Sequence, residues 1–406
     1  MKIPELEITY KSVDGWDYSG GRSMNIWGQI PSSYIPLNEI NKSIMQGKKS
    51  CIWTCYDNAI YSHFDKNGKI LPISQQDLPK TISATFKPTY SKYGVIAENL
   101  GMRIAIALDM PTSYNFIVEF KFNKPEYKNI VNHLNDRDLN KLQKFGIVSI
   151  DFLKPATLKN ENHTQAYSGD RLVLFEESMQ MAHLRFTSDP SKPLLVETWI
   201  KSLKDFVISK KDIALQFMSK EKFVDQINRI ESRIVRSYLL REFIGDCDFT
   251  DMNSGLCYDS KAHTIMYAPN FDYGECFNAL IKTKLDFMPP PEELDVIIKW
   301  DKNYVAKKIE KSKTPVRKLS RNFATATSEE NIKFIINKYP KDAMEFFESL
   351  KLAMHEGRLT NLVDTYTEYT TPLLSKEEAN MFKEYISCRA DFFINTLELG
   401  LNSKEK

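Results

Sequence analysis

The chain has 406 residues, of which 42% are hydrophobic and 27% charged. This composition is typical of globular proteins, so it excludes wholesale disorder and predicts roughly two to three domains of about 100–200 residues each. The 55 Lys and Arg nearly balance the 53 Asp and Glu, so no global field attracts nucleic acid or an anionic membrane. No CxxC pair or HExxH motif is present, which argues against a structural zinc site. No apolar run approaches the roughly 20 residues that span a bilayer, and the expected compartment is a reducing cytoplasm.

The first part of the chain predicts short strands and one helix. The Asn67-Gly68 pair between two strand-like runs is the two-residue turn signature of a hairpin. Apolar and polar residues alternate over 81–87, which predicts a half-buried strand. Apolar positions then recur at helical spacing until Pro111 stops the pattern. Loop and short strand are expected over the first 45 residues, and further strands at 51–56, 59–64, 113–120 and 145–153.

The next part predicts helices followed by a hairpin. Residues 175–245 are mainly helical in pattern, and one helix has a face that we expect to be buried, formed by Ile227, Ile230, Ile234 and Tyr238. The stretch 247–270 is rich in turn residues, which predicts a loop and short strands. Helices are expected to resume after it.

A basic segment marks the expected start of a C-terminal helical extension. Between residues 299 and 321, nine Lys or Arg stand against two acidic residues, and Pro315 interrupts any helix. Three helix starts are expected beyond it, at Ser328, at Pro340 and at the capping box Ser375-x-x-Glu378. Because these helices can bury their apolar faces on one another, we expect a separable unit outside the catalytic site.

Two acidic stretches carry the strongest chemical signal. Residues 245–253 read GDCDFTDMN, and residues 267–274 read YAPNFDYG. Phosphoryl transfer needs one carboxylate beside the attacking hydroxyl and an oxygen-bearing pair that holds magnesium on the nucleotide phosphates. Asp248, Asn253 and Asp272 supply these groups. The alternative is an acidic surface loop whose Asp and Asn residues form turns.

The order and spacing of these groups resemble the catalytic and metal loops of HipA-type kinases, a family of bacterial Ser/Thr protein kinases. The shared pattern is a long helix ending in Gly-Asp, then D-x-x-x-x-N, a hairpin and A-P-x-x-D. Upstream, FKP at 86–88 resembles the family's nucleotide lysine, and AENLGMRIA at 97–105 its glutamate helix. GIVSIDFLK at 146–154 resembles its hinge strand. The resemblance covers about residues 50–280.

On the nucleotide side, the resemblance implies that Lys87 contacts the phosphates of ATP. It implies that Glu98 holds Lys87 in place. The backbone of Asp151, Phe152 and Leu153 would face the adenine. Without the other motifs of the family, a Lys and a Glu at this separation are more often a solvated surface pair.

On the acceptor side, the resemblance implies that Asp248 orients and deprotonates the acceptor hydroxyl. Asn253 and Asp272 would ligate Mg²⁺. Asp246 and Asp251 are interpreted as turn and capping residues, and Asp251 takes over a catalytic role if the alignment is shifted.

The sequence departs from the family pattern at two places. Thr250 stands where family members usually carry a His, two residues after the catalytic Asp. The expected phosphate loop at 53–58 contains no Gly, so its backbone cannot approach phosphates in the usual way. We favour side-chain donors such as Thr54 and Asn58. Weak nucleotide binding, or a loop formed by Gly20-Gly21, are the alternatives.

Together, the resemblance implies an α+β, two-lobed protein-kinase-like fold. Its parts would be an N-terminal antiparallel sheet lobe at 1–155, a helical lobe with the catalytic loop at 156–310, and a C-terminal helical extension at 311–406. The implied activity is an ATP- and Mg²⁺-dependent Ser/Thr protein kinase able to phosphorylate itself. The alternatives are a small-molecule hydroxyl kinase, or a pseudokinase that serves as a binding or scaffold module.

The expected partners are a protein substrate and an antidote or regulatory protein. The basic segment 299–321 lacks interleaved stacking aromatics except Trp300 and Tyr304. It is therefore interpreted as a solvated linker, and nucleic acid is not an expected partner.

Overall fold

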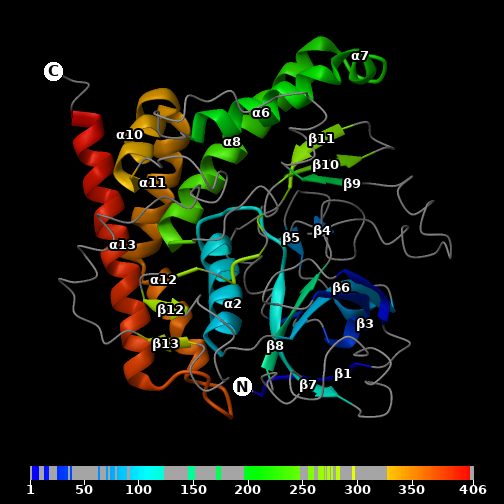
Figure 1. Cartoon of the computed structure of the whole chain (residues 1–406), viewed down its shortest axis with the longest axis vertical. Coiled ribbons are helices and arrows are strands. Elements are labelled where there is room, and N and C mark those ends of the chain that lie inside the picture. Colours follow the sequence, from blue (N-terminus) through cyan, green and yellow to red (C-terminus); the bar gives the residue numbers. More distant parts are fainter. Residues whose placement is uncertain are drawn as a thin grey trace.

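A computed structural model of the chain shows a sheet, a helix lying against it and a group of long helices (Figure 1). The structure describes residues 2–8, 13–17, 25–34, 37–38, 63–64, 70–71, 74–77, 80–88, 92–122, 145–150, 171–174, 196–246, 255–259, 264–268, 270, 272–274, 276–277, 280–283, 295–297 and 327–402. None of the helices in these ranges is both long and apolar enough to cross a bilayer.

The main sheet has six strands in the order β1-β7-β8-β6-β3-β2. Their bounds are β1 Glu5–Ile8, β2 Val13–Asp17, β3 Asn25–Pro31, β6 Thr81–Pro88, β7 Asn115–Phe122 and β8 Phe145–Ile150. The paired strands are antiparallel except β1 and β7, which are parallel. The expected antiparallel sheet is therefore confirmed for the inner strands, and the prediction is wrong at the β1 edge.

Strand β6 runs through the middle of this sheet and carries Lys87. Ala84 and Phe86 are buried, as the alternation predicts, but Thr85 and Lys87 on the opposite face are also at most 9% exposed. The prediction of a half-buried strand is thus wrong over this stretch. Both faces of β6 are covered here, so Lys87 points into a shielded environment and not into solvent.

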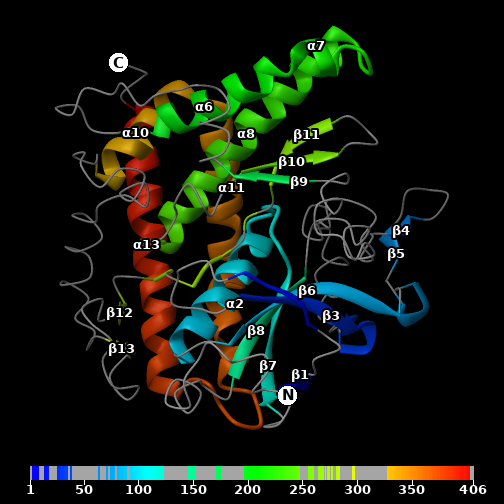
Figure 2. The ribbon, with the colours of Figure 1, turned by 45° about the vertical axis from the view of Figure 1, so that its right-hand side comes forward.

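Helix α2, Lys92–Ala107, follows β6 and packs against β7 and β8. Every residue from Val95 to Ala107 except Arg103 is buried, which fits a helix that is covered on several sides. Asp109, just after the helix, adopts a left-handed φ of 59°, and this ends the helix before Pro111 as expected. Figures 1 and 2 both show α2 between the sheet and the C-terminal helices.

The predicted helical part contains α6 Val196–Ser209, α7 Lys211–Ala214 and α8 Lys220–Ile244. The side chain of Ser219 caps α8 at its start by accepting the Lys222 N–H. Gly245 ends α8 in the left-handed region, and the N–H groups of Gly245 and Asp246 close the last turn on the carbonyls of Glu242 and Arg241. Three residues of the predicted face (Ile230, Ile234 and Tyr238) are buried, and the fourth, Ile227, packs against the core.

Short strands occupy several connections. The predicted hairpin is formed by β10 Gly255–Asp259 and β11 Thr264–Tyr267, and β9 Arg171–Leu174 joins it as a third strand. β4 His63–Phe64 pairs with β5 Ile70–Leu71 on either side of the Asn67-Gly68 pair. β12 Ile281–Thr283 pairs with β13 Asp295–Ile297, and in the described part of the chain the expected helices resume at Ser328. Two short 3-10 turns complete this part, η2 Ser32–Tyr34 and η3 Gln75–Asp77.

The C-terminal part is helical, as predicted. It consists of α10 Ser328–Lys338, α11 Pro340–His355, α12 Arg358–Asn361, η8 Leu362–Tyr366 and α13 Lys376–Asn402. Thr327, one residue before the predicted Ser328, caps α10 in a capping box with Glu330. The predicted box of Ser375 and Glu378 is present at the start of α13.

The C-terminal helices are not a separate unit. Ser328 Oγ donates to buried Glu242 Oε2 of α8 at 2.7 Å, and Arg389 Nε of α13 donates to the Phe243 carbonyl at 3.0 Å. The buried apolar side chains of α2, α8 and α10–α13 belong to one contiguous core. The expectation of a separable extension is therefore wrong, because these helices bury their apolar faces on α8 and α2 as well as on one another. The proposed boundaries near 155 and 310 lie outside the described residues.

Candidate active site

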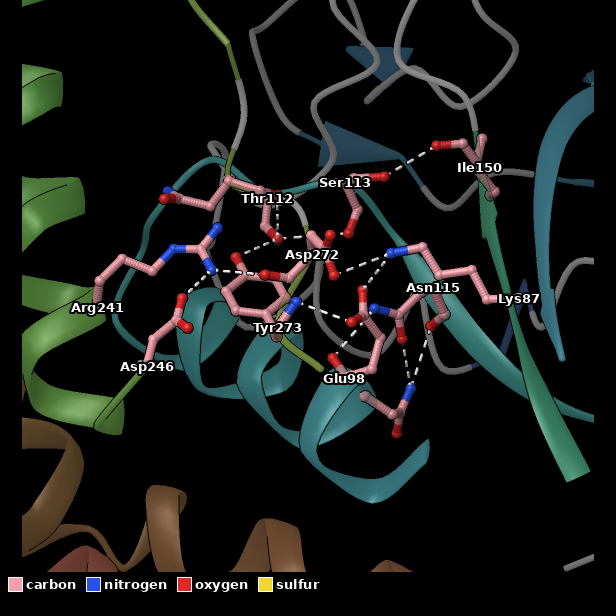
Figure 3. A network of polar contacts seen from close by, with 12 residues as sticks. Lys87, Glu98, Thr112, Ser113, Asn115, Ile150, Arg241, Asp246, Asp272 and Tyr273 are labelled. Carbon is pink, nitrogen blue, oxygen red and sulfur yellow. Dashed lines mark hydrogen bonds and ion pairs between the residues drawn. The ribbon is translucent and has the colours of Figure 1, made fainter. Parts of the chain in front are cut away.

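Lys87, Glu98 and Asp272 meet at one point between the sheet, α2 and the segment after β11 (Figure 3). Lys87 Nζ lies 3.2 Å from Asp272 Oδ1 and 3.5 Å from Glu98 Oε1. The side chains of Lys87 and Glu98 are 11% and 5% exposed, whereas that of Asp272 is 34% exposed. The site thus has a buried ammonium–carboxylate pair and a second carboxylate that reaches toward solvent.

Charge and burial oppose each other at all three groups. Burial lowers the pKa of Lys87, but the charges of Asp272 and Glu98 outweigh it and raise that pKa above its usual range. Burial raises the pKa of Asp272, but the Lys87 ammonium outweighs it and the pKa falls. For Glu98, burial wins over the attraction of Lys87, and its pKa is raised. Lys87 therefore stays charged, and Asp272 is the carboxylate most strongly held in its ionised form.

Glu98 also joins α2 to the segment that carries Asp272. Its Oε2 accepts the backbone N–H of Tyr273 at 2.8 Å, while its Oε1 faces Lys87. One carboxylate therefore fixes both the lysine and the residue after Asp272.

Asp272 has an unusual backbone conformation. Its φ of 62° lies in the left-handed region, which costs a residue with a Cβ of order 1–3 kcal/mol and persists only where the surroundings enforce it. Two contacts hold this segment, because Arg241 Nη1 donates to the Asp272 carbonyl at 2.8 Å and the Tyr273 N–H donates to Glu98 Oε2 at 2.8 Å. The strain is held at the residue that we expect to ligate magnesium.

Arg241 is fully buried and is matched in charge by Asp246. Its Nη1 forms an ion pair with Asp246 Oδ2, and its guanidinium lies 4.3 Å from the centroid of the Tyr273 ring. Asp246 was interpreted from sequence only as a turn or capping residue. The structure adds a second role, since Asp246 neutralises the arginine that supports Asp272.

Gly101 gives Tyr273 the space to lie on α2. A Cβ at Gly101 would stand 2.7 Å from Tyr273 Cβ and 2.8 Å from its Cγ, distances that would force one of the two elements to move. The Tyr273 hydroxyl is bonded to Thr112 Oγ1 at 2.7 Å. Close approach of α2 therefore requires glycine at this position.

The loop before β7 links the Asp272 segment to the end of β8. The Asn270 carbonyl accepts the Ser113 N–H at 2.8 Å and the Thr112 hydroxyl at 3.0 Å. Ser113 Oγ donates to the Ile150 carbonyl at 2.9 Å. Ile150 directly precedes the residues that the sequence resemblance assigns to the adenine, so one loop supports both ends of the candidate nucleotide site.

The structure brings together three of the predicted site residues, Lys87, Glu98 and Asp272. The other predicted residues lie outside the described part of the chain: Asp151, Phe152, Leu153, Asp248, Asp251, Asn253, Thr250, Thr54 and Asn58. Within the described ranges, no group of three His, Cys, Asp or Glu side chains is arranged to hold a metal ion.

The sequence pattern did not indicate a role for Arg241, Tyr273 or Gly101. Their roles depend on contacts between segments far apart in the chain. A sequence signal existed only for the tripeptide Asp-Tyr-Gly at 272–274 and the Gly-Asp pair that ends α8.

No family model matches the chain, and no curated protein matches it. Among solved structures, it is similar to the proinflammatory kinase CtkA of Helicobacter pylori, with a TM-score of 0.46 and 13% identity over 85% of this chain and 98% of that one. It is also similar to HipA of Shewanella oneidensis MR-1, from a toxin–antitoxin complex with HipB and operator DNA. That match has a TM-score of 0.38 and 11% identity over 93% of this chain and 74% of that one.

Proposed function

We propose that the chain is an ATP- and Mg²⁺-dependent protein kinase with two lobes, which transfers a phosphoryl group to Ser or Thr hydroxyls, including its own. The observation that carries this proposal is the position of Lys87 Nζ between Glu98 and Asp272. A buried lysine fixed by one carboxylate, beside a second and more exposed carboxylate, is the arrangement that protein kinases use for phosphoryl transfer.

The chemistry of these side chains fits the nucleotide and the metal. Mg²⁺ prefers oxygen ligands and is usually held by one or two carboxylates together with substrate phosphates. Asp272, 34% exposed, offers such an oxygen, and Asn253 follows from the sequence pattern as the second ligand. When bound, the metal supplies positive charge that neutralises the phosphates.

The chain's own residues divide the remaining work. Lys87 Nζ would donate to phosphate oxygens while Glu98 keeps it oriented. Asp248, two residues after buried Asp246, would take the proton from the acceptor hydroxyl as it attacks. The backbone of Asp151, Phe152 and Leu153 would bind the adenine.

A pseudokinase that acts as a scaffold is the second candidate. It is favoured by one observation, the absence of Gly from residues 53–58. If the chain is a kinase, we expect a protein substrate and a regulatory or antidote protein as partners. If it is a pseudokinase, we expect only a protein that it binds. Small-molecule hydroxyls are the remaining acceptor class.

The two candidates are separated by the fate of the γ-phosphate. The purified protein would be incubated with Mg²⁺ and either γ-labelled or α-labelled ATP, alone and with a protein extract, and EDTA would serve as the blank. We expect label on protein from γ-labelled ATP only. Label from neither nucleotide, in spite of ATP binding, would contradict the kinase assignment and favour the scaffold.

A further inference from the structure

Helix α2 is held by the C-terminal part of the chain at both ends and in the middle. It carries Glu98, and its other side packs on β7 and β8. The distance from Lys87 Nζ to Glu98 Oε1 is 3.5 Å, which is already at the outer limit of a hydrogen bond. A shift of α2 by about 1 Å would therefore break this contact.

Glu378 of α13 holds the first turn of α2. Its Oε1 lies 3.0 Å from Lys92 Nζ and accepts the hydroxyl of Tyr93. Its Oε2 accepts the N–H of Ser375 at 2.6 Å, in the capping box of α13. The glutamate is thus fixed to its own helix while it binds two neighbouring residues of α2.

Tyr366 holds the middle of α2, next to Glu98. The Tyr366 ring is fully buried, and its hydroxyl donates to Asn99 Oδ1 at 2.9 Å. Asn99 Nδ2 in turn donates to Asn115 Oδ1 of β7 at 2.9 Å. One buried chain of hydrogen bonds therefore runs from the C-terminal part through α2 to the sheet.

Arg358 holds the last turn of α2. Its Nη1 donates to the carbonyl of Ala107, the last residue of the helix, at 2.9 Å. Carbonyls at a helix end have no partner within the helix and carry partial negative charge. A cation at this position satisfies one of them and fixes the helix along its axis.

We infer that Arg358, Tyr366 and Glu378 form a C-terminal clamp that sets the position of α2 and thereby the contact of Glu98 with Lys87 and Tyr273. They are positioning residues for the proposed phosphoryl transfer, and this role rests on the proposed function. The contacts lie at three heights of one helix, so together they restrain its translation and its tilt.

The clamp can be tested without any nucleotide, through the amide of Tyr273. This N–H donates to Glu98 Oε2, so it loses protection from hydrogen exchange when α2 moves. Tyr366→Phe and Glu378→Gln each remove clamp hydrogen bonds while keeping side-chain size. We expect the hydrogen-exchange rate of the Tyr273 amide, measured by NMR, to rise about tenfold in each variant. This is the factor that corresponds to the loss of one hydrogen bond.

Matched controls come from α11 and the residue before it, next to the elements that carry the clamp. Tyr339→Phe removes a hydroxyl that donates to Glu231 of α8, and Glu345→Gln removes an ion pair with Arg236 of α8. The hydrogen bond and the ion pair that these controls remove both lead to α8, so exchange at Tyr273 should stay at the wild-type rate. Unchanged exchange at Tyr273 in both clamp variants would overturn the clamp. Equal acceleration at protected amides of α8 would overturn it too, because that result indicates general destabilisation.

Phosphotransfer gives the second readout. In an otherwise unchanged protein, Tyr366→Phe should lower kcat and should raise the KM for ATP about tenfold. In a Glu98→Gln background the same substitution should have no further effect, because the contact between Glu98 and Lys87 that Tyr366 positions is already lost. An undiminished effect in that background would contradict the clamp. Absence of transfer in wild type would contradict the proposed function alone, since exchange at Tyr273 still decides the clamp.

Discussion

The ammonium of Lys87 is stable in a buried site because two carboxylates face it. Its distances to Asp272 and Glu98 are 3.2 Å and 3.5 Å. Removing one partner from a buried ion pair typically costs about 3–5 kcal/mol, since the remaining charge is left uncompensated. An ammonium has three N–H donors, and these two acceptors leave one donor for a phosphate oxygen of the proposed nucleotide.

At the level of single residues, Asp248→Asn should distinguish phosphotransfer from ATP binding. Because the carboxylate acts on the acceptor hydroxyl, we expect phosphotransfer to fall by about 10²–10⁴-fold, the usual contribution of a general base. The affinity for ATP and the folding should stay nearly intact. Asp225→Asn, at an exposed position of α8, is the control for a lost surface carboxylate. Wild-type turnover of the Asp248 variant in a label-transfer assay would refute the assignment.

Lys87, Glu98 and Asp272 were predicted through the resemblance of their surrounding motifs to those of HipA-type kinases, and the structure brings the three side chains together. Arg241 could not be predicted, because it meets Asp272 and Tyr273 only after the chain has folded. Asp246 was noticed but given too small a role for the same reason.

Among the elements, α2 is the one whose placement decides the site. Gly101→Ala should raise the intrinsic helix propensity by about 1 kcal/mol, yet its Cβ would stand 2.7 Å from Tyr273 Cβ. Overpacking of this kind typically costs about 1–3 kcal/mol, so we expect net destabilisation and weaker ATP binding. Gly94→Ala, in the first turn of the same helix, is the control. Thermal unfolding and titration with ATP measure both effects, and a stabilised variant with unchanged ATP affinity would contradict the proposed packing.

Elements with a clear period or cap were predictable. The alternation predicted the strand β6, although not the burial of both its faces. Helical spacing predicted α2, Gly245 ends α8 and the capping box at Ser375 starts α13. β1 and β9 each contain four residues, too few to show a period. Their pairing is decided by distant strands, β7 and β10, which no local pattern reveals.

For the whole molecule, buried Glu242 connects the core to the C-terminal helices. It accepts hydrogen bonds from Tyr238 and Ser328, and burial raises its pKa above the ordinary 4.5 in spite of these donors. The folded state then binds the proton more tightly than the unfolded state. The stability that Glu242 contributes is therefore complete below pH 4.5 and is lost as the pH rises through the folded pKa.

Glu242→Gln tests the predicted loss of stability with rising pH, because the amide stays neutral at every pH. As the pH rises above 4.5, the wild type should lose stability relative to the variant by about 1.4 kcal/mol per pH unit, until the folded pKa is passed. Urea unfolding at a series of pH values measures the difference. Glu348→Gln, exposed on α11, is the control for the loss of a surface carboxylate. If the wild type became more stable relative to the Gln variant as the pH rises, this would contradict a raised pKa for Glu242.

The shared core also predicts the fate of a shortened chain. A chain ending at Lys318 would expose Phe243, which packs on Phe393 at 5.7 Å between ring centroids, and Phe277, which packs on Phe382 at 5.6 Å. We expect it to be insoluble or unfolded, whereas a chain ending at Asn402 should fold as the full chain does. A soluble fragment ending at Lys318 that still binds ATP would show that the C-terminal helices are dispensable for the site.

The nucleotide site itself is tested most directly by titrating ATP, with and without Mg²⁺, into wild type, Lys87→Ala, Asp272→Asn and the exposed control Lys222→Ala. Wild type and the control should bind Mg-ATP equally and gain in thermal midpoint, since a ligand bound only by the folded state stabilises it. Lys87→Ala should bind at least about tenfold more weakly and still require Mg²⁺, because a hydrogen bond to a charged group contributes roughly 1.5–3 kcal/mol. Asp272→Asn should lose the Mg²⁺ dependence. No binding by wild type, or equal Mg-ATP affinity in all four proteins, would contradict a nucleotide site at Lys87, Glu98 and Asp272.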